Sequence, residues 1–272
     1  MKTRFVLINT SHAGNVGAAA RALKTMGFDD LVLVEPRWAN VLRREETIQR
    51  ASGALDVLEN ARIVATLDEA LDGMSHLCAT AMTPRDFGPP TAAPRAHFER
   101  LLGTGAAAGV DVPAQSGVAF LFGSERFGMA NEDVYRCHVA LSIPTNPGFG
   151  SLNLGAAIQV IAYEWRMALG GFGAPAAEPA PERGLADTDA APARELADAA
   201  QTRELADAAQ VAGMLAHWER ALVDIGFLDP EAPKKLMPRL NQLFNRAQLG
   251  SEEIHILRGV AKAMIETAQA KR

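Results

Sequence analysis

Short apolar runs separated by stretches with helical spacing constrain the fold of this 272-residue chain more than any other feature. Each run is rich in Val, Ile, Leu or Phe, as are strands that are buried on both faces of a sheet. The runs are Phe5–Asn9, Leu31–Val34, Arg62–Val64, His76–Thr80, Val118–Phe122 and Val139–Ile143. Strands that alternate with helices at this cadence predict an α/β fold with a largely parallel sheet.

Helical spacing fills the gaps between these runs. The helices predicted there are Ala18–Met26, Ala54–Leu58, Leu67–Asp72, Arg95–Leu102, Asn131–Cys137 and Asn153–Leu169. The last of these is amphipathic, because Leu154, Ile158 and Ile161 fall on one face. Three further helices are predicted near the C-terminus, over Val211–Ile225, Lys234–Ala247 and Ser251–Ala270. They predict a small all-helical C-terminal domain.

The segment 172–210 has the composition of a linker. It carries 14 Ala and 4 Pro among 39 residues, and no aromatic residue after Phe172, so it can bury little surface. The sequence Arg194–Gln201 recurs as Arg203–Gln210, and a nine-residue step turns a helix by about half a turn. The repeat therefore does not extend one packing face. We expect domains at 1–171 and 211–272, joined by this linker.

The net charge of −5 is concentrated in the linker, where 3 basic residues face 8 acidic ones. Residues 211–272 carry 9 basic and 7 acidic residues, so a nucleic-acid partner is allowed although the charge does not require one. No apolar run reaches the roughly 20 residues of a membrane helix, and none at the N-terminus suits a signal peptide. Cys78 and Cys137 make neither a disulfide framework nor a metal motif. We expect a cytoplasmic protein with no membrane association and no metal.

Three polar, glycine-containing loops follow predicted strands: Asn9–Gly17, Gly123–Gly128 and Pro144–Asn153. Ligands of open parallel sheets bind beyond the carboxyl ends of the strands, so these loops form the candidate site. Each loop alone also has a simpler explanation, because glycines shape turns and asparagines cap helices. Taken singly, Arg21 and Glu125 are more typical of solvated surface positions than of catalytic ones.

A dinucleotide site is an open alternative. Glu35 follows Gly17 by eighteen residues, the spacing at which NAD-binding proteins place an acid for the ribose. However, the stretch Gly14–Gly17 lacks the G-x-G-x-x-G pattern, and Pro36 follows the acid directly.

Taken together, the three loops resemble the three motifs of the SpoU class of SPOUT RNA methyltransferases. The matching residues are Asn15, Gly17 and Arg21 in the first motif, Phe122, Gly123, Glu125 and Gly128 in the second, and Ile143, Pro144 and Ser151–Ala157 in the third. Residues 4–171 also resemble the TrmJ subfamily, which methylates the ribose of nucleotide 32 in the tRNA anticodon loop. That closer match is carried by Thr10–Asn15, Arg21–Gly27 and Gln159–Glu164.

The resemblance implies a fold with a C-terminal trefoil knot, a homodimer without a stable protein partner, tRNA as substrate and S-adenosylmethionine (SAM) as methyl donor. The residues that it implies for SAM binding are Thr80, Ala81, Met82, Gly123, Ile143, Ser151, Leu152 and Asn153. The catalytic residues that it implies are Asn15, Arg21, Glu125 and Ser151.

The chemistry of a guanidinium limits the role of Arg21. A group with a pKa above about 12 is a poor base, so we expect Arg21 to grip the target phosphate and stabilise the developing alkoxide. That phosphate or Glu125 would accept the proton. Two alternatives remain open: a 2′-O-methyltransferase that acts on ribosomal or other RNA, and a catalytically silent factor that binds SAM and RNA. The sequence also leaves open whether cytidine or uridine is methylated and which tRNAs are substrates.

Two groups of basic residues are candidates for RNA contact. We expect the first group on or near the face that the first loop reaches: Lys24, Arg37, Arg43, Arg44 and Arg50. The second group falls mostly on one predicted helix: Lys234, Lys235, Arg239 and Arg246. A solvated basic helix face explains the second group equally well.

Overall fold

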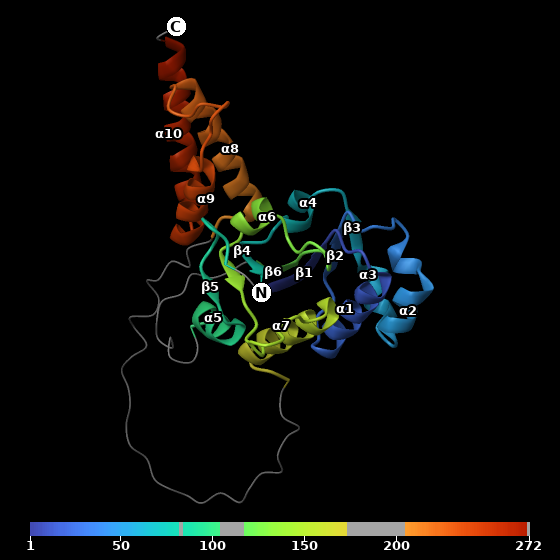
Figure 1. Cartoon of the computed structure of the whole chain (residues 1–272). Helices are drawn as coiled ribbons and strands as arrows, with labels where there is room; N and C mark the ends of the chain where they lie inside the picture. The colour runs from blue at the N-terminus through green and yellow to red at the C-terminus, as the bar shows by residue number, and fades with distance from the viewer. Residues whose placement is uncertain (82–83, 104–116, 173–204, 271–272) are drawn as a thin grey trace, which may run out of the picture.

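The computed structural model describes residues 1–81, 84–103, 117–172 and 205–270. Within these ranges, seven parallel strands form one sheet with helices on both faces (Figure 1). The strand order is β3-β2-β1-β6-β4-β7-β5, so that β1 lies inside the sheet between β2 and β6. This is the α/β fold that the apolar runs predict.

The strands are β1 (Lys2–Ile8), β2 (Leu31–Val34), β3 (Arg62–Val64), β4 (His76–Thr80), β5 (Thr91–Ala92), β6 (Gly117–Phe122) and β7 (Val139–Leu141). All except β5 coincide with predicted runs to within a few residues. The sequence analysis missed β5 because two residues in a proline-rich stretch produce no periodic pattern.

One face of the sheet packs against α1 (Ala13–Thr25), α5 (Pro94–Leu101) and α7 (Leu154–Ala168). Phe5 and Phe120 from adjacent strands meet there with ring centroids 5.2 Å apart, and Trp165 of α7 covers Phe120 at 5.6 Å. The helices α2 (Glu45–Ala51) and α3 (Leu55–Asn60) and the 3-10 turn η1 (Val41–Arg43) extend this layer beside α1.

The other face carries a second core. Val6 and Leu121, which alternate with the residues of the first face, pack with α4 (Leu67–Leu71) and α6 (Asn131–Tyr135). Because side chains of a strand alternate between the two faces, strands covered on both sides must be apolar throughout. The burial of all six residues of β6 is the clearest example.

Helix α1 begins five residues earlier than the sequence pattern predicts, so Asn15 lies in its first turn rather than capping it. Gly17 lies inside the helix, where an added Cβ would come within 2.1 Å of the Thr47 carbonyl oxygen of α2. An added Cβ on Gly155 of α7 would come within 2.8 Å of Ala18. These motif glycines therefore let α1 pack closely between α2 and α7, rather than only shaping a turn.

The C-terminal region consists of α8 (Ala208–Asp224), α9 (Leu236–Ala247) and α10 (Ser251–Ala270), which project from the sheet beside α6 (Figure 1). Met214, Phe244 and Ile254 form its core. Helix α8 begins three residues before the predicted start, with a capping box between Asp207 and Gln210. The end of the second repeat copy is therefore part of this helical region.

The chain returns across the sheet after β7, because α7 packs against α1 and α5. A trefoil knot in this region stays a prediction from the family resemblance. Among the described residues, no helix combines the length and apolarity needed to cross a membrane.

Candidate active site

The three predicted loops meet at the carboxyl ends of the central strands. A cavity of about 650 Å³ opens there, beyond β4 and β6 and beside the N-termini of α1 and α7. Its walls include Asn15 from the first loop, Gly123 and Glu125 from the second, and Ser151 and Asn153 from the third. The cavity lies where open parallel sheets bind ligands.

Glu125 is the centre of the hydrogen bonds that join these loops. Its Oε1 accepts hydrogen bonds from Thr10 Oγ1 at 2.8 Å, Asn15 Nδ2 at 2.9 Å and the His12 backbone N–H at 3.3 Å. Its Oε2 accepts hydrogen bonds from the Ser11 backbone N–H at 2.8 Å and the Ser11 hydroxyl at 2.7 Å. One carboxylate therefore fixes the whole turn between β1 and α1.

These bonds control the charge of Glu125. Partial burial alone would raise its pKa, but the hydrogen bonds from Asn15 and Ser11 outweigh burial and lower the pKa to about 2. The carboxylate is thus ionised at neutral pH, with donors on both oxygens. A group with so low a pKa is a weak proton acceptor at neutral pH, which favours a positioning role over that of general base.

The third loop joins the same network through Asn153. Its Nδ2 donates to Asn15 Oδ1 at 3.2 Å, and its Oδ1 accepts the Ala156 backbone N–H at 3.2 Å as the cap of α7. The capping role that the sequence suggested for Asn153 is therefore present together with the contact to Asn15. The hydrogen bonds from Asn15 to Glu125 and from Asn153 to Asn15 together orient both ends of the Asn15 amide.

The residues implied for SAM binding lie mostly around this cavity. Those that line it are Thr80, Ala81, Gly123, Ser151, Leu152 and Asn153. Thr80 uses its hydroxyl within the sheet, donating to the Leu121 carbonyl at 2.8 Å. Ile143 packs against the core and is not among the lining residues. Met82 lies outside the described residues.

Gly123 lets the second loop close on itself. Ser124 and Gly128 exchange backbone hydrogen bonds of 3.0 and 2.8 Å, and this turn presents Glu125 to the first loop. A Cβ on Gly123 would come within 2.2 Å of the Gly128 carbonyl carbon, and Gly128 itself has φ of +70°. Both motif glycines are therefore required by the turn itself.

The structure does not bring Arg21 into the cavity formed by its own chain. Its side chain is exposed on α1, it is absent from the lining, and among the described residues it has no hydrogen-bond or ion-pair partner. Asn15 and Arg21 are six positions apart on α1, which places them on different faces of the helix. Of the four catalytic residues implied by the resemblance, Asn15, Glu125 and Ser151 are brought together.

Sequence reasoning missed Arg85, which also lines the cavity. Its Nε is buried and has no hydrogen-bond partner among the described residues. Such an unpaired donor suits an anionic group in the cavity, because an unsatisfied buried N–H costs about 1–3 kcal/mol. No recognised motif contains Arg85, so only its position identifies it.

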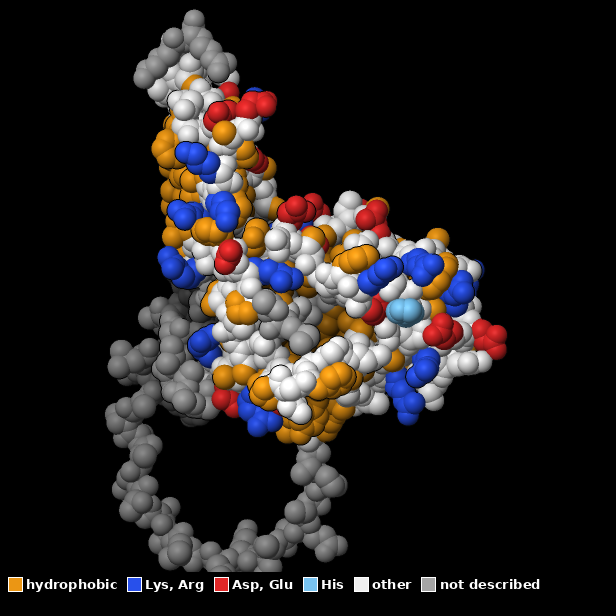
Figure 2. All heavy atoms as spheres, in the orientation of Figure 1, with side chains coloured by type: hydrophobic (Ala, Val, Ile, Leu, Met, Phe, Trp, Pro, Cys, Tyr) orange, Lys and Arg blue, Asp and Glu red, His pale blue; other side chains and the backbone are white. Residues whose placement is uncertain are grey.

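A second hollow of about 740 Å³ adjoins the first and shares His12, Ser124 and Glu125 with it. Arg37 and Arg126 line it, and Phe127 beside it is 81% exposed. Figure 2 shows further Lys and Arg side chains over the neighbouring end of the sheet, near α2. Cations and an exposed aromatic ring are the groups that bind RNA phosphates and unstacked bases.

Comparison with known proteins agrees with this geometry. The sequence model of the SpoU rRNA methylase family matches residues 2–163, which include all three loops. The chain belongs to the SpoU methylase family. The model of the C-terminal domain of the tRNA methyltransferase TrmJ matches residues 209–272, so this SpoU protein also carries the helical domain of the TrmJ subfamily.

Two relatives of this SpoU protein match over nearly their whole length. The tRNA (cytidine/uridine/adenosine-2′-O-)-methyltransferase TrmJ of Pseudomonas aeruginosa is 41% identical, covering 100% of this chain and 95% of the relative. The tRNA (cytidine/uridine-2′-O-)-methyltransferase TrmJ of Cronobacter sakazakii is 37% identical, covering 99% of this chain and 98% of the relative. The crystal structure of TrmJ from Z. mobilis ZM4 superposes with a TM-score of 0.72 at 27% identity, covering 97% of this chain and 99% of that one.

Proposed function

We propose that this SpoU protein transfers a methyl group from SAM to the ribose 2′-oxygen of cytidine or uridine at nucleotide 32 of the tRNA anticodon loop. The observation that carries the proposal is the network around Glu125, which assembles three separate motif loops around one cavity. The full-length relatives are named as tRNA 2′-O-methyltransferases of cytidine and uridine, which supports the substrate class.

The residues present fit SAM. The cavity has the volume of a site for a drug-sized ligand, and the unpaired Arg85 Nε in its wall suits a carboxylate. Leu152 is 39% exposed at the cavity, an apolar surface for an adenine ring, and the loops at Thr80–Ala81, Gly123 and Ser151–Asn153 offer backbone polar groups. When bound there, SAM supplies a methyl group already activated on a sulfonium.

Because the methyl group is activated, the chain has mainly to align the ribose and remove one proton. Glu125 holds Asn15 and the first loop in place, and Asn153 fixes the Asn15 amide from the other side. Ser151, exposed at the cavity wall, is available to hydrogen-bond the ribose. With the pKa of Glu125 at about 2, we assign Glu125 to positioning, Arg21 to gripping the target phosphate and stabilising the developing alkoxide, and the ribose proton to solvent water at the open cavity.

A homodimer completes this arrangement. The outer side of α7 exposes Tyr163 by 46%, Met167 by 50% and Leu169 by 37%, and apolar side chains gather at this side of the molecule in Figure 2. Such a patch suits burial against a second copy. Since Arg21 lies outside the cavity of its own chain, we propose that it serves the cavity of the second copy.

The RNA surface extends from the second hollow toward α2. Arg37 and Arg44 stack on Trp38 with distances of 4.7 and 4.4 Å to the ring centroid, which holds both guanidinium groups at the surface. Lys24 forms an ion pair with Asp56 at 2.8 Å and is therefore less available to bind an RNA phosphate.

The proposal also includes the domain division at residues 171 and 211, a cytoplasmic location, and the absence of a stable protein partner.

Ligand specificity is tested first by thermal unfolding with SAM or NAD. We expect SAM to raise the melting temperature and NAD to leave it unchanged, because only binding to the native state shifts unfolding. Stabilisation by NAD alone would contradict the proposal and favour a dinucleotide site.

Activity is tested with methyl-labelled SAM and two tRNA transcripts that differ only in a ribose or a 2′-deoxyribose at nucleotide 32. We expect about one methyl group per ribose transcript and none in the deoxy control, which lacks the acceptor oxygen. Equal labelling of both transcripts would refute nucleotide 32. Labelling of ribosomal RNA alone would identify the second candidate substrate, which the description of the family as rRNA methylases favours.

A further inference from the structure

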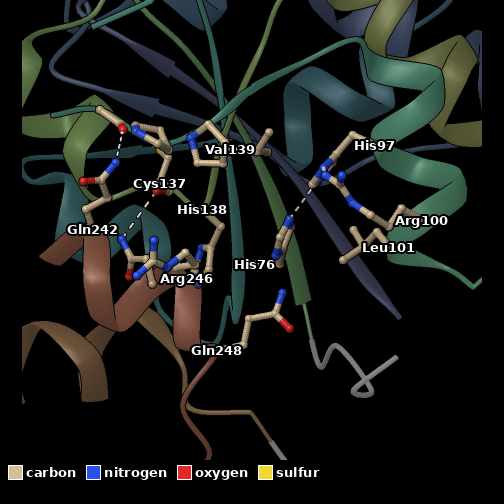
Figure 3. A pocket seen from close by; sticks show the side chains of 14 residues that line it. His76, His97, Arg100, Leu101, Cys137, His138, Val139, Gln242, Arg246 and Gln248 are labelled. Atoms are coloured by element: carbon tan, nitrogen blue, oxygen red, sulfur yellow. Dashed lines mark hydrogen bonds between the residues drawn. The ribbon is translucent and has the colours of Figure 1, made fainter. Parts of the chain in front are cut away.

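A cavity separate from the candidate active site lies where the sheet meets the C-terminal helices. It has a volume of about 600 Å³, with walls from β4, α5 and the start of β7 on one side and from α9 on the other (Figure 3). The described residues that line it include two arginines, three histidines and three side-chain amides, but no Asp or Glu. The walls therefore carry positive charge and many hydrogen-bond donors.

The hydrogen bonds of two buried histidines fix which of their nitrogens carry protons. A guanidinium can only donate, so Arg100 Nη2 donates to His97 Nδ1 at 3.1 Å and leaves the proton of His97 on Nε2. His97 Nε2 then donates to His76 Nε2 at 3.0 Å, which leaves the proton of His76 on Nδ1. Burial keeps both rings neutral, because it lowers the pKa of His97 to about 4 and that of His76 well below its ordinary value.

The donor at the end of this chain has no partner. His76 is only 2% exposed, and its Nδ1 forms no hydrogen bond among the described residues. Buried N–H groups are nearly always paired, so this one points to an acceptor that the described fold does not supply. The Gln248 side chain points toward the same ring in Figure 3, and its rotation opens the path from the cavity to His76.

His138 adds a second donor to the cavity. Its Nδ1 accepts the Leu77 backbone N–H at 3.1 Å, and burial lowers the pKa of His138 to about 4. The proton of this neutral ring is therefore on Nε2, which has no hydrogen-bond partner among the described residues. Two histidine N–H groups are thus available to one ligand.

Arg100 and Arg246 supply the charge. They are exposed on α5 and α9, on opposite sides of the cavity in Figure 3, and neither forms an ion pair among the described residues. Two guanidinium groups match the charge of a phosphate monoester, about −1.5 to −2 at neutral pH, better than the single charge of a carboxylate. Arg100 also polarises the hydrogen bonds from His97 to His76, which strengthens His76 Nδ1–H as a donor.

We propose that this cavity binds the phosphate group of a phosphate monoester. His76 Nδ1 and His138 Nε2 donate to its oxygens inside the cavity, and the two arginines compensate its charge from the exposed sides. An internal phosphodiester of a nucleic acid continues as a chain on both sides, so it cannot reach a donor as buried as His76 Nδ1. A free or terminal phosphate can.

The rest of the cavity suits the organic part of such an ester. Its volume is within the range of sites for small organic molecules, roughly 300–1,000 Å³, and Pro90, Leu101 and Val139 provide apolar walls. Because its walls come from both the sheet and α9, a bound ester connects the two regions. The cavity shares no described lining residue with the candidate active site, so the proposal does not depend on methyl transfer.

The test is a calorimetric titration of the full chain with phenyl phosphate, with phenol as the matched control that lacks the phosphate. We expect one equivalent of phenyl phosphate to bind, inorganic phosphate to compete with it, and phenol not to bind. Arg100→Gln and Arg246→Gln should each weaken binding at least about tenfold, the effect of a lost hydrogen bond between charged groups. Arg220→Gln, at an exposed arginine of α8 outside the cavity, should bind like the wild type.

The buried donor is tested by His76→Phe, which removes the N–H and keeps an aromatic ring. We expect binding at least about tenfold weaker in a variant whose far-ultraviolet circular dichroism matches the wild type. In the wild type, the nitrogen NMR resonance of His76 Nδ1 should shift on saturation with phenyl phosphate, which reports the new hydrogen bond without a substitution.

Two tRNA transcripts, with and without a 5′-phosphate, identify the source of the monoester. Displacement of phenyl phosphate by the 5′-phosphorylated transcript alone identifies an RNA end, and displacement by neither identifies a free small molecule. Equal displacement by both overturns the monoester assignment. The proposal is also overturned if phenyl phosphate does not bind at millimolar concentration, or if Arg100→Gln and Arg246→Gln bind it like the wild type.

Discussion

At the scale of single residues, the site depends on the hydrogen bonds that the Glu125 carboxylate accepts. Glu125 receives five hydrogen bonds from the first loop and α1, and its charge is what makes all five donors favourable. The sequence identified Glu125 and Asn15 by resemblance, but it could not predict that they bond each other, because their separation of 110 residues is closed only by the sheet.

Glu125→Gln tests this role. The amide keeps the shape but places an N–H donor against other donors, so we expect a fall in kcat of at least about a hundredfold and destabilisation of about 1–3 kcal/mol. Single-turnover methyl transfer and urea unfolding measure the two effects. Glu132→Gln, an equal charge change at an exposed residue of α6, should alter neither. Wild-type activity in Glu125→Gln would refute the positioning role.

The pKa of Glu125 also predicts a pH dependence of stability. Because its folded pKa is lowered to about 2 from an ordinary value of 4.5, its contribution is fully present above pH 4.5 and is lost as pH falls toward 2. Urea unfolding between pH 6 and 2 should therefore show a smaller acid loss for Glu125→Gln than for wild type. Identical pH profiles of the two proteins would contradict the assigned pKa shift.

At the scale of elements, the sequence predicts β2, β3 and β4 with their observed ends, because their apolar runs are bounded by polar or turn residues. It misses α2, whose exposed Glu45, Glu46 and Gln49 leave no apolar period. It also places Lys234 and Lys235 on a helix, whereas α9 begins at Leu236.

The contact between α9 and α6 is carried by a buried asparagine. Asn245 Nδ2 lies 3.1 Å from the Arg136 carbonyl oxygen and 3.4 Å from those of Tyr135 and Cys137, at the C-terminal end of α6. Asn245→Ala should remove the donor to the Arg136 and Cys137 carbonyl oxygens, while Tyr135 keeps its hydrogen bond from Asn241 Nδ2 at 2.8 Å. We expect a cost of about 1–3 kcal/mol and faster amide hydrogen exchange in α9. Leu243→Ala, at an exposed neighbour, is the control. Unchanged exchange in Asn245→Ala would show that other contacts hold α9 in place.

The salt dependence of tRNA binding tests whether the basic residues at the start of α9 contact RNA. Lys235 and Arg239 stack on Phe87 at 4.2 and 5.0 Å, while Lys234 is exposed. If this segment contacts RNA, charge reversal of Lys234 and Lys235 to Glu should reduce the slope of log K for tRNA binding against log salt by about one per lost phosphate contact. An unchanged slope would identify a solvated surface.

At the scale of the whole molecule, the order of the strands and the docking of the C-terminal helices could not be predicted from local patterns. The homodimer is an expectation from the resemblance, and the structure adds the exposed position of Arg21. Arg21→Ala should lose methyl transfer but keep its affinity for SAM, because Arg21 lies outside the cavity lining. Loss of SAM affinity in this variant would contradict the assigned role.

Mixing two inactive variants tests whether Arg21 acts across the dimer. In a dimer of Arg21→Ala with Glu125→Gln, one cavity keeps its own Glu125 and receives Arg21 from the second copy. Random exchange of subunits should therefore restore about a quarter of wild-type activity, since about half of the dimers are mixed and each has one intact site. No recovery after demonstrated subunit exchange would place Arg21 and Glu125 in the same functional site of one chain.

The central claim is methylation of a ribose 2′-oxygen at one nucleotide, and alkaline digestion tests it most directly. A 2′-O-methyl group blocks attack of that oxygen on its own phosphate, so a methylated nucleotide survives as an alkali-resistant dinucleotide. After reaction of the full chain with labelled SAM and unmodified tRNA, we predict that the label is in the dinucleotide of positions 32 and 33. Label in alkali-sensitive mononucleotides, or no label despite SAM binding, would contradict the account.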